Sequence, residues 1–112
     1  MPNQHVALTS VFQALSDPTR RAVIERLTRG PTPVTELARP FTMALPSFSQ
    51  HLSVLESCGL VRSKKVGRVR TYRLAPDPLR KAEHWMARQR SQWEQRLDQL
   101  DDYANQLQEK KS

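Results

Sequence analysis

Cationic side chains gather in the middle of the chain, in a stretch without carboxylates. Between Ser57 and Pro76 the sequence contains no Asp or Glu. The cations of this stretch are Arg62, Lys64, Lys65, Arg68, Arg70 and Arg73. Lys and Arg donate charge-assisted hydrogen bonds to phosphate oxygens, so such a stretch favours contact with a polyanion. The candidate phosphate contacts are Lys64, Lys65, Arg68 and Arg70.

A second group of polar side chains lies just before this stretch and suits the reading of base edges. Small hydroxyls, an amide and an imidazole can bond base edges or phosphates without steric crowding. The candidates are Ser47, Ser49, Gln50, His51 and Ser53. His51 precedes an apolar Leu52 that we expect to be buried, so it also has an interpretation as a hydrogen-bonded structural histidine. Both interpretations are open at this point.

The overall charge agrees with an anionic partner. Lys and Arg total 18 against 11 Asp and Glu, which gives a formal net charge of +7 over 112 residues. Such a balance favours nucleic acid first and acidic membrane surfaces second. No apolar run approaches the ~20 residues that a membrane span needs. The start of the sequence lacks the pattern of a secretion signal, so we expect a cytoplasmic protein.

The elements that must position these side chains begin with two short helices. Apolar residues recur with helical spacing over residues 6–15. Asp17 and Pro18 suit the N-cap and the first position of a second helix. That helix is expected to end near Gly30. Its exposed residues are predicted to be Arg20, Arg21 and Arg26.

Two further helices are expected before the cationic stretch. Thr32 would cap the third helix and Pro33 would open it. The fourth helix is expected to span Leu45–Ser57, and Gly59 is the residue that terminates it. Its buried stripe is predicted to be Phe48, Leu52 and Leu55. Helical spacing leaves the base-reading candidates on its other faces. Two helices joined by a short turn, the second polar on its outer face, suit reading of the ~12 Å major groove.

After Gly59 the pattern changes to a hairpin and then to a long helix. Residues 60–66 and 69–74 are β-branched and charged, and Gly67 and Arg68 between them indicate a tight turn. A long helix over residues 78–107 follows. Its apolar seam includes Leu79, Met86, Trp93, Leu97 and Leu100. One small domain cannot cover this seam, so we expect a second copy of the chain to bury it.

Several stretches of the sequence resemble the ArsR type of winged-helix regulators. The stretches are Phe12–Arg21 (FQALSDPTRR), Ser49–Glu56 (SQHLSVLE), Gly59–Val61 and Tyr72–Leu74. This resemblance implies a homodimeric repressor, with the first and last helices at the dimer interface, bound to a pseudo-palindromic operator in double-stranded DNA. It also implies DNA contacts by the polar candidates of the fourth helix. Many relatives have Ser-Gln where this chain has Ala44 and Leu45, so the usual capping hydroxyl and glutamine donor are missing.

The predicted fold is mainly α with a small β-hairpin wing: a winged helix-turn-helix that is dimeric through its terminal helices. Residues 1–112 are interpreted as one domain. Its parts are a DNA-binding core at 6–75, a wing at 60–74 and a dimerisation helix at 78–107.

Many ArsR-type regulators sense metals, but this sequence shows no set of residues that would bind a metal ion. The third helix has no Cys, and the last helix offers only His84 beside Glu83, whereas a transition metal needs three or four converging donors. We therefore expect a non-metal-sensing branch with no cofactor. Cys58 is interpreted as a small core residue rather than a redox switch. Trp85 and Trp93 are interpreted as dimer core rather than an effector pocket.

Two classes of function stay open. The leading hypothesis is a sequence-specific regulator that represses its own or neighbouring genes, with an unknown effector. The alternative is a winged-helix module that binds another protein without specific DNA binding. The sequence shows no paired carboxylates, no nucleophile with a base and no glycine loop for phosphate, so we do not expect an enzyme.

Overall fold

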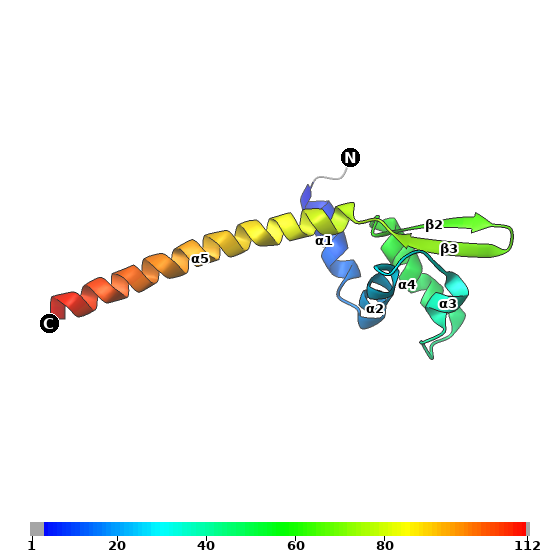
Figure 1. Cartoon of the computed structure of the whole chain (residues 1–112), viewed down its shortest axis with the longest axis horizontal. Coiled ribbons are helices and arrows are strands. Elements are labelled where there is room, and N and C mark those ends of the chain that lie inside the picture. Colours follow the sequence, from blue (N-terminus) through cyan, green and yellow to red (C-terminus); the bar gives the residue numbers. More distant parts are fainter. Residues whose placement is uncertain (1–3, 112) are drawn as a thin grey trace. The chain divides into compact units, whose positions relative to one another are not determined.

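The computed structural model describes residues 4–111 of the chain, with side chains described for residues 7–110. It divides into two compact units, Met1–Ala82 and Glu83–Ser112. The first holds the helical core and the hairpin (Figure 1). The second belongs to the last helix, and each unit is described by itself. Among the described residues, no helix is both long and apolar enough to cross a membrane.

The first unit contains the short helices that the apolar spacing predicts. They are α1 (Gln4–Ala14), α2 (Pro18–Leu27), α3 (Val34–Ala38) and α4 (Leu45–Ser57). Helix α2 begins where predicted, because Asp17 Oδ2 accepts the N–H of Arg20 at 3.0 Å and Pro18 needs no N–H partner. Beyond its end, Gly30 has a φ of 134°, a value that L residues rarely adopt.

A three-stranded antiparallel sheet completes the unit. Its strands are β1 (Thr32–Pro33), β2 (Val61–Val66) and β3 (Val69–Leu74), in the order β1-β3-β2. The prediction that Thr32 caps the third helix is wrong. Thr32 is fully buried opposite Tyr72, its hydroxyl donates to the carbonyl of Gly30 at 3.0 Å, and Pro33 occupies the N-cap of α3 without a side-chain hydrogen bond.

The core lies between the helices and the inner face of this sheet. The predicted stripe of α4 is confirmed: Phe48, Leu52 and Leu55 are each at most 1% exposed. Around them lie Val23, Leu37, Leu60 and Val61, which are also almost completely buried. Half-buried Cys58 packs against this cluster, as its interpretation as a core residue requires.

Helix α4 ends in a Schellman turn that leads directly into the hairpin. Gly59 has a φ of 79°, and its N–H bonds the carbonyl of Glu56 at 3.0 Å. The N–H of Leu60 bonds the carbonyl of Leu55 at 3.0 Å, and both of these leucines are fully buried. These two bonds satisfy the carbonyls of Leu55 and Glu56 near the end of the helix, and they require the left-handed conformation that glycine tolerates best.

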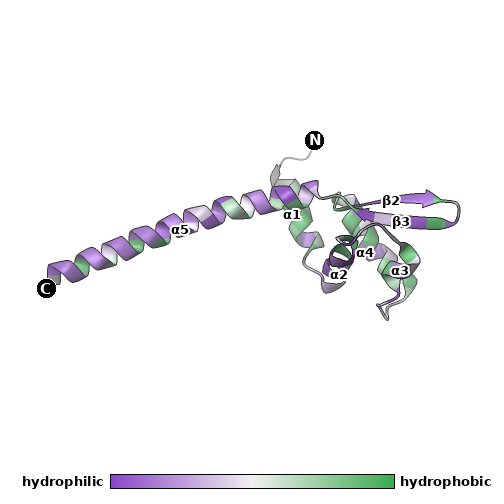
Figure 2. Cartoon of the chain, viewed as in Figure 1, coloured by the Kyte–Doolittle hydropathy of each residue, from purple (hydrophilic) through white to green (hydrophobic). Residues whose placement is uncertain are grey.

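The last helix, α5, runs from Asp77 to Lys111. Its first turns belong to the first unit, where Ala82 is buried and Leu79 packs against the core cluster. From Glu83 onward the residues belong to the second unit. Figure 2 shows this helix as mainly hydrophilic with separate hydrophobic positions along it.

Candidate nucleic-acid interface

The solvent face of α4 carries most of the predicted base-reading side chains. Four of them, Ser47, Ser49, Gln50 and Ser53, are exposed. They lie there because the apolar residues of the same helix face the core at a spacing of three and four residues. Their hydroxyls and amide donate and accept hydrogen bonds, so this face can contact base edges as well as phosphates.

The N-terminus of α4 has no side-chain cap. Ala44 occupies the N-cap without a side-chain hydrogen bond, and Pro46 stands in the first turn. This agrees with the sequence, which has no capping hydroxyl at this position. The first N–H groups of any helix have no intrahelical partner, and the helix dipole makes this end positive. A backbone phosphate is one group that satisfies such donors.

The turn between α3 and α4 is fixed by aromatic packing. The rings of Phe41 and Phe48 lie with their centroids 5.2 Å apart, and Met43 also packs against the core cluster. This contact connects the turn to the buried side of α4. The exposed face of α4 is therefore presented by a helix whose entry is held in place.

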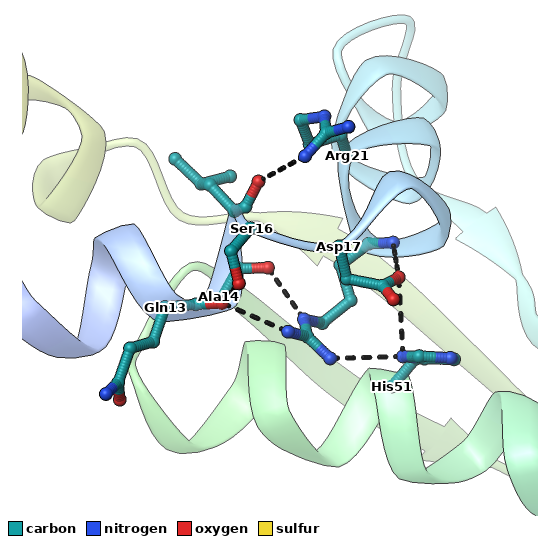
Figure 3. A network of polar contacts seen from close by, with 8 residues as sticks. Gln13, Ala14, Ser16, Asp17, Arg21 and His51 are labelled. Carbon is teal, nitrogen blue, oxygen red and sulfur yellow. Dashed lines mark hydrogen bonds and ion pairs between the residues drawn. The ribbon is translucent and has the colours of Figure 1, made fainter.

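His51 differs from its polar neighbours because it is held by another helix. Its side chain is 22% exposed, and Nδ1 lies 3.2 Å from Arg20 Nη1 and 3.7 Å from Asp17 Oδ2. Figure 3 shows the ring beside the start of α2. The interpretation as a structural histidine thus has a geometric basis, and the predicted DNA contact stays a prediction.

Arg20 is the residue that inspection of the sequence missed. It was predicted to be exposed, yet its guanidinium is part-buried among carbonyls of α1 and the ring of His51. The available signal was its place three residues after the N-cap Asp17, near the end of the preceding helix. The hydrogen bond from the Arg20 N–H is the main cause that lowers the pKa of Asp17 below 3.8, although burial opposes this shift.

The hairpin of β2 and β3 forms the predicted wing. Gly67, with a φ of 63°, and Arg68 make its turn, and the paired residues beside the turn are Val66 and Val69. A glycine at the first central position of a two-residue loop is typical of a type II′ turn. All four predicted phosphate contacts are exposed, and Figure 2 shows the strands as mainly hydrophilic.

The strand register divides these cations between two faces. Residues directly opposite each other share a face, and successive residues alternate. Lys65 and Arg70 are opposite each other on the face that also carries buried Tyr72. On this face Arg70 Nη1 donates to Ser63 Oγ at 2.8 Å. Lys64 lies on the other face, where it is joined by the pair Arg62 and Arg73.

The other expectations about sites concern α5 and metal ligands. In the second unit, Met86, Trp93, Leu97 and Leu100 are 47–68% exposed. Leu79, the remaining residue of the predicted seam, instead packs within the first unit. Across the described side chains, no group of three or more His, Cys, Asp or Glu is close enough to hold a metal ion.

Comparisons with known proteins agree with this geometry. Residues 15–64 match a helix-turn-helix domain family. The chain is 48% identical over 68 residues to the HTH-type transcriptional regulator Rv2034 of Mycobacterium tuberculosis, covering 61% of this chain and 64% of that protein. It thus spans less than two thirds of this relative. It is 32% identical over 79 residues to the transcriptional repressor SdpR of Bacillus subtilis, covering 70% of this chain and 88% of that protein.

Solved structures show the same architecture. An ArsR family transcriptional regulator is 51% identical, with a TM-score of 0.78 over 84% of this chain and 97% of that one. The homodimeric winged helix-turn-helix DNA-binding domain Mb0332 of Mycobacterium bovis is 26% identical, with a TM-score of 0.61 over 80% of this chain and 83% of that one. The predicted winged helix-turn-helix fold is therefore confirmed.

Proposed function

Because this chain belongs to the ArsR family of transcriptional regulators, we propose that it binds a specific operator in double-stranded DNA and represses adjacent genes. The observation that carries the proposal is the combination, within one unit, of an exposed polar face on α4 and a cationic hairpin directly after it. Helix α4 would read base edges in the major groove, and the wing would bind the flanking backbone. Such a protein acts where the DNA is, in the cytoplasm of its cell.

Repression requires only occupancy of the operator. SdpR, to which the chain is similar, is named as a transcriptional repressor. A protein bound across a promoter blocks access of the polymerase without any chemical step. The function therefore needs no metal or other cofactor, and the identity of an effector is a separate question.

We further propose that the chain acts as a homodimer. The related domain Mb0332 is described as homodimeric. In this chain, Trp93, Leu97 and Leu100 are more than half exposed, which leaves an apolar seam for a second copy to cover. A two-fold symmetric dimer would read a pseudo-palindromic operator with half-sites about one helical turn apart.

Fluorescence anisotropy on DNA from upstream of the gene, beside a scrambled duplex, tests this function. Binding to the upstream duplex alone, weakening with salt by about 0.9 in the log–log slope for each phosphate contacted, is the expected result. Absence of binding to either duplex at low salt would overturn it.

The variant that distinguishes the alternative, a protein-binding module, is the double substitution Arg68→Ala and Arg70→Ala. For a DNA-binding regulator, this variant loses operator binding and repression. For a protein-binding module that uses its basic surface for solubility, the function in the cell hardly changes. Circular dichroism of the variant controls for loss of the fold.

A further inference from the structure

The guanidinium of Arg20 connects three helices at one point. Its Nε donates to the carbonyl of Ala14 at 2.6 Å and its Nη2 to the carbonyl of Gln13 at 3.0 Å. These two acceptors form the end of α1. Its Nη1 reaches Nδ1 of His51 on α4 at 3.2 Å. Arg20 itself belongs to α2, so one side chain joins the ends of two helices to the helix proposed to read DNA.

This contact determines which nitrogen of His51 carries the proton. A guanidinium has N–H donors and no acceptor, so Nδ1 must offer its lone pair. In a neutral imidazole with Nδ1 as acceptor, the proton is on Nε2. The competing partner is Asp17, whose carboxylate would accept a proton from Nδ1. At 3.7 Å its oxygen lies farther away than the 3.2 Å contact with Arg20, and beyond hydrogen-bond length.

The remaining nitrogen of the ring is directed away from the Arg20 contact. Nδ1 faces α2, and Nε2 is on the opposite side of the ring (Figure 3). His51 adjoins the exposed Gln50 on α4 and keeps 22% of its side chain exposed. Its N–H can therefore donate to a group that approaches the solvent face of this helix.

We propose that Arg20 is a positioning residue that holds His51 in the Nε2–H form, so that this N–H donates to an acceptor on the operator. This inference deepens the proposed function and rests on it. The acceptor is a phosphate oxygen or a purine N7, since both accept a single N–H. Arg20 contributes by orienting the ring and does not touch the DNA.

Arg21 provides a matched control. It is also an arginine of α2 that donates to a carbonyl near the end of α1, from Nη1 to Leu15 at 2.7 Å. Its side chain is exposed, and no hydrogen bond to α4 is found for it among the described residues. Replacing either arginine by Gln removes one positive charge. Arg21→Gln removes one arginine–carbonyl contact, whereas Arg20→Gln removes two and also releases His51.

The first test needs no DNA. Long-range ¹H–¹⁵N correlation spectra of the free protein at neutral pH report which imidazole nitrogen of His51 carries the proton. The Nε2–H form is expected in the wild type and in Arg21→Gln, and a mixture of tautomers in Arg20→Gln. A wild-type spectrum with the proton on Nδ1 would overturn the inference.

The second test measures operator affinity. Arg20→Gln and His51→Ala should each weaken binding roughly tenfold, the size of one lost hydrogen bond. Arg21→Gln should be near wild type, and His51→Gln, which keeps an N–H donor near Nε2, should recover most of the loss. In a double-mutant cycle, Arg20→Gln should add little once His51 is Ala. Equal losses for Arg20→Gln and Arg21→Gln would assign Arg20 a purely structural role.

Modified operators identify the acceptor and separate the two proposals. A methylphosphonate or a 7-deazapurine at the contacted position should lower wild-type affinity to that of His51→Ala and leave that variant unchanged. If no position in the half-site behaves so while the wild type still selects the operator, the inference fails and the regulator function stands. If the wild type does not distinguish operator from scrambled DNA, the function fails, and the tautomer spectrum still tests the Arg20 contact.

Discussion

Helices α4 and α5 carry apolar stripes of similar spacing but bury them very differently. In α4, Phe48 and Leu52 are 1% exposed, because the sheet and the other helices of the same unit cover them. In α5, Trp93 is 68% exposed and Leu100 is 58% exposed. Periodicity therefore indicates which residues need cover, and it does not indicate which chain supplies the cover. Four predictions test this contrast, the two faces of the wing and the start of α2.

The largest effect is expected in the stripe of α4. Phe48→Ala removes a ring that is 1% exposed and packs against Phe41, so the free energy of unfolding should fall by about 3–5 kcal/mol. Urea denaturation measures this change. Trp93→Ala, studied at a concentration where the chain is monomeric, is the control and should leave the free energy nearly unchanged. Similar losses for both variants would contradict the contrast.

The next effect concerns the stripe of α5. Leu97→Ala and Leu100→Ala each remove an apolar side chain whose full burial contributes about 1.5–3 kcal/mol of free energy. Each should weaken dimerisation at least tenfold, as measured by sedimentation equilibrium over a range of concentrations. Gln99→Ala on the same helix is the control and should have little effect. A wild-type chain that stays monomeric at micromolar concentration would show that a second copy is not the cover.

A smaller effect should distinguish the two faces of the wing. Lys65→Gln with Arg70→Gln changes the face that packs on the core, and Arg62→Gln with Lys64→Gln changes the opposite face. We expect the first pair to lower the salt slope of DNA binding by about 0.9 for each lost phosphate contact, and the second pair to lower it less. A salt titration by anisotropy measures both. Equal changes would mean that the wing uses both of its faces.

The smallest effect concerns acid stability at the start of α2. The pKa of Asp17 is lowered from 3.8 by its bond to the Arg20 N–H, so the folded state favours the carboxylate. This stabilisation is present above the unfolded value and is lost as the pH falls through the lowered pKa. Asp17→Asn should therefore reduce the acid-induced decrease in melting temperature below pH 3.8, relative to the wild type. An unchanged pH profile would contradict this assignment.

The sequence predicted those helices and turns well whose bounds depend on residues close by in the chain. The bounds of α4 at Leu45 and Ser57 agree with the structure, because its apolar spacing and Gly59 are both local features. The hairpin turn at Gly67 was predicted for the same reason. The strand β1 was missed, because two residues become a strand only by pairing with Tyr72, distant in the sequence.

The site was predicted in part, for a related reason. Four of the polar residues on α4 are exposed because the helical period places them there, although their contacts with DNA stay predictions. The contact between Arg20 and His51 joins residues 31 positions apart, so no local pattern could indicate it. The division of the wing cations into two faces depends on the strand register, which composition alone does not contain.

The short connection after α4 has a mechanical consequence. Only Cys58, Gly59 and Leu60 separate the end of α4 from the start of β2, and Leu60 is fully buried. With the Leu60 N–H bonded to Leu55, this connection has little freedom to twist. If α4 rotates about its axis in the major groove of DNA, the hairpin has to move with it. We therefore expect α4 and the hairpin to keep a constant spacing, which depends on the left-handed conformation of Gly59.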